Sequence, residues 1–173
     1  MRITTDRLKN VRGEADVLAL YDDIRQSSGF ADFAQRFMHY EDSRVARNAL
    51  WTLTKASNQE LSALQPMLHE FIDLGMNAEN PAVKRLALTI VERLKISVDD
   101  LRTDFLNYCL EHMTDVEEQP SIQSLCMKIA FRLCRFYPEL MGEFMRTLEA
   151  MEISYYTAAA KCVRSKILSG KRV

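Results

Sequence analysis

The sequence predicts an all-α fold, an α-α superhelix (solenoid) of about four helical hairpins preceded by an N-terminal capping helix. Three observations predict it. Apolar residues recur three and four positions apart, as in Leu101, Phe105, Cys109 and Met113, which is the spacing of one helix face. Only five Gly and four Pro occur in 173 residues, too few to separate many short strands. Finally, four methionines mark a nearly constant interval along the chain.

These methionines are the clearest sign of an internal repeat. Met38, Met76, Met113 and Met151 follow one another at intervals of 38, 37 and 38 residues. Each closes an amphipathic stretch, and a polar turn and a second amphipathic stretch come after it. The second stretches read SRVARNALWTLTKA, PAVKRLALTIVERLK, PSIQSLCMKIAFRLCRF and SYYTAAAKCVRSKIL. The period therefore corresponds to one hairpin of two helices.

The expected helix starts carry suitable capping chemistry. Pro81 and Pro120 fall at the first position of two second helices, where the missing N–H of proline costs nothing. Two capping boxes are expected to open first helices, Ser57-x-x-Glu60 and Ser97-x-x-Asp100. We expect a single domain with these parts: an N-terminal cap (1–29, its helix at 13–28), repeats 30–56, 57–96, 97–136 and 137–168, and a basic tail (169–173).

The run LSALQPMLHEFIDLGMNAENPAVKRLALTIVERLK resembles a HEAT repeat, with a helix, a polar turn, a proline and a "V-K/R-x-x-A" start to the second helix. The resemblance covers residues 30–168 and is weakest in the last hairpin, where the turn shortens and the proline is missing. It departs from the family at Ala46 and Gln123, where a basic residue is usual. Tetratricopeptide repeats have a shorter period and a Trp/Gly/Tyr signature that this chain lacks. The resemblance implies an elongated, curved stack with second helices on its concave side.

Charge is sorted between the two helices of the hairpins. The first helices with their turns carry 3 basic and 18 acidic residues, whereas the second helices carry 13 basic and 1 acidic. The overall net charge of −1 conceals this separation. These counts take the first helices as 30–42, 58–80, 97–120 and 138–153, and the second as 43–56, 81–96, 121–137 and 154–168.

The cations of the second helices are expected to form one exposed row, here called the basic stripe. Positions i, i+4 and i+8 share a helix face, and in the common register Arg47 aligns with Arg85 and Lys55 with Arg93. The candidate binding residues of the basic stripe are Arg47, Trp51, Lys55, Arg85, Arg93, Lys128, Arg132, Lys161 and Arg164. Candidate apolar anchors beside it are Trp51, Phe131, Met127 and Leu88.

The stripe has a functional and a purely structural interpretation. Lysines and arginines can be ordinary solvated residues, and the acidic layer can neutralise them or complement helix dipoles. The near absence of acids from the second helices favours an anionic ligand instead. An acidic protein or peptide needs only a local basic groove, whereas duplex nucleic acid usually requires a domain of high pI. We therefore expect a binding or scaffold protein that holds an acidic protein or peptide on its concave face, with a nucleic-acid-binding or DNA-alkylation-repair-like protein as the alternative. We expect a monomer or weak self-association.

Neither a catalytic nor a metal site is expected. The chain has no G-x-S-x-G, P-loop or G-x-G-x-x-G motif, and His39, His69 and His112 lack metal-ligand spacing. We therefore predict no enzyme activity, no cofactor and no metal. The four cysteines show no C-x-x-C spacing, lie among apolar residues, and are expected to be buried free thiols. With no signal peptide and no apolar run of about 18 residues, we expect a cytoplasmic protein that does not enter membranes.

Overall fold

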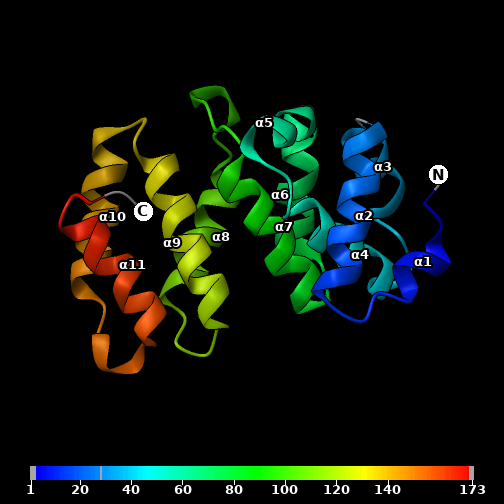
Figure 1. Cartoon of the computed structure of the whole chain (residues 1–173). Coiled ribbons are helices and arrows are strands. Elements are labelled where there is room, and N and C mark those ends of the chain that lie inside the picture. The colour runs from blue at the N-terminus through cyan, green and yellow to red at the C-terminus, as the bar shows by residue number, and fades with distance from the viewer. Residues whose placement is uncertain (1–2, 28, 172–173) are drawn as a thin grey trace. The chain divides into compact units, whose positions relative to one another are not determined.

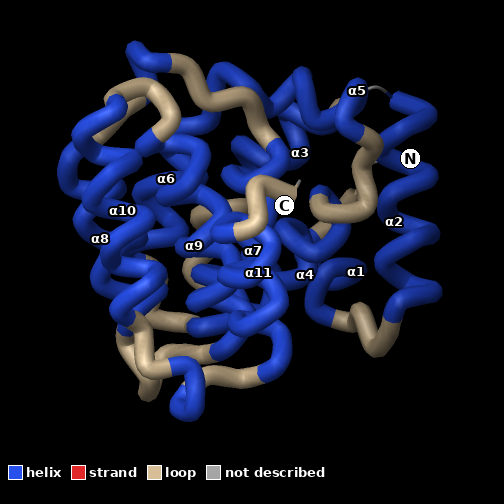
Figure 2. Tube along the Cα trace, turned by 90° about the vertical axis from the view of Figure 1, so that its left-hand side faces the viewer, coloured by secondary structure: helices blue, strands red, loops and turns tan. Residues whose placement is uncertain are grey.

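The computed structural model describes residues 3–27 and 29–171 (Figure 1). All regular elements in these ranges are helices joined by loops, which confirms the predicted all-α helical repeat fold (Figure 2). The chain divides into two compact units, Met1–Lys95 and Ile96–Val173. The predicted basic tail is described only as far as Lys171, and residues 172 and 173 lie outside the described residues.

Helix α4 lies at the centre of the first unit, because α1, α2, α3 and α7 all pack against it. Its hairpin partner is α3, and α7 pairs in the same way with α6. The elements of this unit are α1 (Thr5–Lys9), α2 (Glu14–Ser27), α3 (Phe30–Phe37), α4 (Ser43–Leu53), α5 (Asn58–Leu61), the 3₁₀ helix η1 (Ser62–Met67), α6 (Leu68–Asn77) and α7 (Pro81–Arg93).

The predicted N-terminal cap helix is present as α2, and position 28 lies outside the described residues. Helix α1, a short helix with Thr4 as its N-cap, was not expected from the sequence. Its single buried residue is Leu8, so hydrophobic periodicity gave little signal over five residues.

The first helix of the second hairpin is interrupted, which corrects the prediction of one continuous helix. The capping box of Ser57 and Glu60 opens α5 as expected, but α5 ends at Leu61 and a 3₁₀ segment follows. Pro66 lies inside that segment. Because proline has no N–H and its ring clashes with the preceding turn, a regular α-helix cannot continue through it.

The second helices of this unit begin as predicted. The carboxylate of Asp42 accepts a hydrogen bond from the backbone N–H of Arg44 at 3.0 Å, which caps α4. The side chain of Asn80 accepts from Ala82 and Val83 at the start of α7, beside proline at the first helical position. These caps set the register that carries the basic stripe.

Helices α6 and α7 approach each other closely at a glycine. A Cβ atom on Gly75 would lie 2.8 Å from Leu88 Cδ2 and 3.1 Å from Leu88 Cγ. Leu88 is fully buried, so its side chain has little room to move. Glycine at this position therefore permits the contact that holds the second hairpin together.

The second unit is organised around α9, against which α8, α10 and α11 pack. Its elements are the 3₁₀ helix η2 (Val98–Asp100), α8 (Thr103–Thr114), α9 (Pro120–Cys134), α10 (Pro138–Ala150), the 3₁₀ helix η3 (Ile153–Tyr155) and α11 (Ala158–Leu168). The core side chains of α9 include Ile122, Cys126 and Leu133.

Two helix starts in this unit differ from the predictions. The capping box of Ser97 and Asp100 opens η2 and not α8, because α8 begins only at Thr103. In the last hairpin the turn is longer than expected: η3 fills it, and α11 begins at Ala158 with Thr157 as its N-cap. Thr157 therefore provides the N-cap of α11.

Three cysteines are buried and all four are free, but Cys162 is exposed, which corrects the prediction that every thiol is buried. Helix α11 buries only Ala160 and Ile167, so Cys162 remains at the surface although its sequence neighbours include apolar residues. Within the described residues, no helix is both long and apolar enough to cross a membrane.

Candidate binding pocket

The packing of α4 against α7 brings together part of the basic stripe. Arg47 and Trp51 lie one turn apart on α4, and Arg85 lies on the neighbouring α7. All three side chains are half-buried and line the same pocket. The register inferred from the sequence, in which Arg47 and Arg85 are equivalent, is therefore consistent with this local arrangement.

We call this cavity the three-arginine pocket. It has a volume of about 350 Å³ and is lined by Val11, Arg12, Arg47, Trp51, Arg85 and Leu86. Three arginines thus line a space to which one tryptophan and two aliphatic residues also contribute. None of these described lining residues carries a carboxylate.

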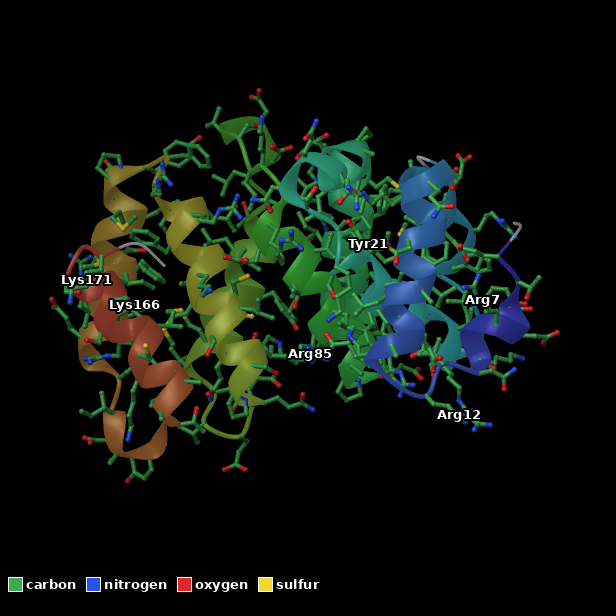
Figure 3. All side chains as sticks on the ribbon, viewed as in Figure 1. Arg7, Arg12, Tyr21, Arg85, Lys166 and Lys171 are labelled. Atoms are coloured by element: carbon green, nitrogen blue, oxygen red, sulfur yellow. The ribbon has the colours of Figure 1, made fainter. Side chains whose placement is uncertain are left out.

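Arg12 was not among the predicted site residues. It lies in the loop between α1 and α2, outside the repeats, and is exposed (Figure 3). Its backbone N–H donates to the Asp16 carboxylate at 2.8 Å, which fixes the loop against the start of α2. No repeat register includes this loop, so its approach to α4 and α7 follows only from tertiary packing.

Asn48 is the residue that holds this loop and Arg47 in place. Its side chain is fully buried, and its Nδ2 donates to the backbone carbonyl of Leu8 at 2.8 Å. Its Oδ1 accepts from Arg47 Nε at 3.1 Å. One buried amide therefore links α4 to the end of α1 and orients an arginine of the pocket. A single asparagine within an apolar stretch is the sequence signal that could have indicated this role.

The arginines of the pocket are not neutralised within the described part of the chain. Among the described residues, no carboxylate forms an ion pair with the guanidinium group of Arg12, Arg47 or Arg85. Like charges gathered at a small cavity repel one another, and an anion placed between them relieves that repulsion.

Two other residues of the basic stripe in this unit have structural partners. Lys55 forms an ion pair with Glu14 on α2, and this contact lowers the pKa of the Glu14 carboxyl group. Arg93 donates to the backbone carbonyls of Thr54 at 2.8 Å and Ala56 at 2.6 Å, just beyond the end of α4. Such contacts satisfy carbonyl groups that a helix end leaves unpaired.

The remaining stripe residues belong to the second unit. Lys128 and Arg132 are half-buried on α9, and both have interaction partners. Lys161 is exposed on α11. Arg164 repeats the role of Arg93, since its Nε donates to the carbonyl of Leu148 near the end of α10 at 2.6 Å.

The predicted apolar anchors are mostly core residues. Leu88 and Met127 are fully buried and cannot contact a partner, which corrects that prediction. Phe131 is half-buried and packs on Phe144, with ring centroids 6.1 Å apart. Trp51 lines the three-arginine pocket and remains partly accessible.

The histidines and carboxylates do not assemble into a metal centre in the described parts of the chain, where no group of three metal-ligating side chains occurs. His39 and His69 are exposed, whereas His112 is half-buried between the Tyr108 ring and Glu118. Its Nδ1 lies 2.5 Å from Glu118 Oε2, which ties α8 to the turn before α9.

Comparison with known proteins decides the family. A profile of the HEAT repeat domain matches residues 4–171, nearly the whole chain. The chain belongs to the HEAT repeat family. No curated protein and no solved structure matches the sequence. As a HEAT repeat protein it has a helical repeat fold of the kind that mediates protein interactions.

In the third hairpin this HEAT repeat protein departs from its family pattern at the position directly after Ile122. Gln123 replaces the usual basic residue in the third hairpin, is buried, and donates from Nε2 to the Asp115 carbonyl at 2.5 Å. A hydrogen bond from a neutral side chain therefore joins α9 to the turn that follows α8.

Proposed function

We propose that this HEAT repeat protein is a non-enzymatic binding or scaffold protein, and that the three-arginine pocket holds an acidic segment of a partner protein. The observation that carries the proposal is that Arg12, Arg47, Arg85 and Trp51 line one pocket with no carboxylate among its described lining residues. The partner supplies the missing negative charge.

The chemistry of the pocket suits a carboxylate-bearing side chain. A guanidinium group presents a planar fork that binds a carboxylate through two parallel hydrogen bonds. Trp51, Val11 and Leu86 offer apolar surface for the methylene groups or an adjacent hydrophobic residue of the same segment. Tryptophan and arginine are also the residues that most often dominate binding energy at protein interfaces.

Size and charge favour a peptide over nucleic acid. The pocket volume of about 350 Å³ accommodates one or two side chains. The chain has a net charge of −1 and a pI near 6.3, whereas nucleic-acid-binding domains usually combine an extended basic surface with a high pI. A cytoplasmic location belongs to the same proposal, supported by four free cysteines.

The test uses a short fluorescein-labelled peptide of alternating glutamate and leucine, followed by anisotropy and by the fluorescence of Trp51. The R47E/R85E variant should bind at least tenfold more weakly, because each charge-assisted hydrogen bond contributes about 1.5–3 kcal/mol and 1.4 kcal/mol is a factor of ten. The control variant R44E/R146E makes the same charge change at exposed arginines that do not line the pocket.

Three results would overturn the proposal. The first is unchanged affinity of R47E/R85E, and the second is equal loss in both variants, which would indicate diffuse attraction. The third is that a single- or double-stranded DNA oligonucleotide binds the wild type more tightly than the acidic peptide does. If R47E/R85E abolishes that binding and R44E/R146E does not, the pocket would be assigned to nucleic acid.

A further inference from the structure

The first unit carries a second and larger cavity with the opposite charge. It has a volume of about 620 Å³ and lies where the turn between α3 and α4 meets the turn between α6 and α7. Its lining residues are Met38, His39, Tyr40, Glu41, Ser43, Ala46, Leu74, Ala78, Glu79, Asn80, Pro81 and Val83. We call it the turn groove.

The floor of the turn groove is apolar and rigid. Met38, Ala46 and Val83 are buried members of the core, each at most 4% exposed, and they reach the groove from α4, α7 and the end of α3. Asn80 fixes one wall, because its Oδ1 caps α7 and its Nδ2 contacts the Ser43 hydroxyl at 3.4 Å. The groove is therefore formed by well-packed helix ends.

The negative charge of the turn groove comes from equivalent positions of two repeats. Glu41 and Glu79 each follow the repeat methionine by three residues, and both are exposed at the groove. No ion-pair partner for either carboxylate occurs among the described residues. Nearby Asp42, by contrast, pairs with Lys9 and caps α4, so its pKa is lowered by structural contacts.

Tyr40 gives the groove an aromatic surface. Its side chain is 40% exposed, and its ring lies 6.4 Å from that of Phe37, which anchors it to the core. An aromatic face next to two carboxylates attracts cations, since the ring quadrupole and the carboxylates act in the same direction. Neither lysine nor arginine occurs among the described residues that line the groove, and the lining residue His39 lies 3.9 Å from Glu70.

We infer that the turn groove binds a basic peptide segment. A lysine or arginine side chain lays its aliphatic stem on the accessible apolar surface of Leu74, Ala78 and Pro81 and places its charge between Glu41 and Glu79, against the Tyr40 ring. The volume lies within the range of pockets that bind ligands, and charge complementarity selects the occupant. This inference does not depend on the three-arginine pocket, which requires an acidic partner.

The experiment titrates the full chain with a short fluorescein-labelled peptide of alternating lysine and leucine at low salt. The E41Q/E79Q variant should bind at least tenfold more weakly than wild type. Tyr40→Ala should weaken binding several-fold, whereas Tyr40→Phe should bind like wild type, because the ring and not the hydroxyl group contacts the cation. The glutamate–leucine peptide should bind E41Q/E79Q as well as it binds wild type.

The matched control is E139Q/E149Q, which removes two exposed acids on α10 and makes the same change in net charge. It should leave affinity for the lysine–leucine peptide within about twofold. The inference is overturned if wild type does not bind the peptide, if E41Q/E79Q binds it as tightly as wild type, or if the control variant loses as much affinity.

Discussion

Replacing Asn48 by alanine tests whether one buried amide holds the three-arginine pocket together. Its Nδ2 donates to the Leu8 carbonyl at 2.8 Å, and its Oδ1 accepts from Arg47 Nε at 3.1 Å. Alanine removes both contacts. We therefore expect a loss of stability and a loss of affinity for an acidic peptide in the same variant, because the loop carrying Arg12 is no longer tied to α4.

The size of the effect follows from the contacts. The Leu8 carbonyl keeps one weak bond, from the Val11 N–H at 3.4 Å, so the lost hydrogen bond costs about 1 kcal/mol and not a full desolvation penalty. The void left by the amide in a fully buried position adds about 1 kcal/mol. A total of about 2 kcal/mol corresponds to a fall of about 1 M in the urea midpoint for a typical small domain.

The assay is urea unfolding followed by the fluorescence of Trp51, the one tryptophan of the chain, which lies in the first unit. Thr52→Val is the matched control. Thr52 is equally buried, but its hydroxyl only donates to the Asn48 carbonyl within α4, at 2.8 Å. Its loss should cost less than about 1 kcal/mol. If Asn48→Ala lowers the midpoint no more than Thr52→Val does, the assigned role of Asn48 is wrong.

Three further predictions concern stability and thiol chemistry. Gly75→Ala should destabilise the first unit by about 1 kcal/mol, because overpacking against Leu88 (about 1–3 kcal/mol) outweighs the gain of about 1 kcal/mol in helix propensity. In a Leu88→Val background the same substitution should be neutral or stabilising. Urea unfolding measures both effects. Ser57→Ala should cost about 1 kcal/mol through loss of the capping box, and an unchanged urea midpoint would contradict this. Near pH 8, Ellman's reagent should label about one thiol per folded chain, and Cys162→Ser should abolish the reaction. Burial raises the pKa of the Cys134 thiol to about 11, so this group keeps its proton and stays unreactive until the pH approaches that value; rapid labelling of Cys162→Ser near pH 8 would refute the assignment.

The repeat was predictable because it rests on local signals. A helical period and proline at helix starts act within a few residues, and α4, α7 and α9 begin where those signals place them. The same local reasoning misplaced the first helix of the second hairpin, since it gave the amphipathic pattern priority over Pro66. Periodicity indicates which residues face the core, whereas a single proline decides whether the helix continues.

The candidate binding pocket was only partly predictable. Register alone aligned Arg47 with Arg85, because equivalent positions of stacked repeats lie side by side. Arg12 could not be found in this way, since it comes from a loop outside the repeat period. Arg93 and Arg164 were predicted to bind a partner, but both donate to backbone carbonyls near helix ends. Sequence spacing gives the position of a cation and not its hydrogen-bond partner.

The separation of charge between the first and second helices of the hairpins has two components, and the structure distinguishes them in the first unit. Part of it maintains the fold: Asp42 caps α4, Glu60 closes a capping box, and Arg93 satisfies carbonyl groups near a helix end. These charges would be present in a repeat protein with no ligand.

The other component has no such role. Arg12, Arg47 and Arg85 border one cavity, whereas Glu41 and Glu79 border another, and none of these described groups forms an ion pair. Both cavities are built on α4 and α7, with the turn groove at the start of these helices and the three-arginine pocket farther along them. The helix pair α4 and α7 thus carries unneutralised positive charge at one place and unneutralised negative charge at another. This arrangement favours a partner that presents an acidic and a basic segment together. Binding of such a partner should weaken in R47E/R85E and in E41Q/E79Q alike.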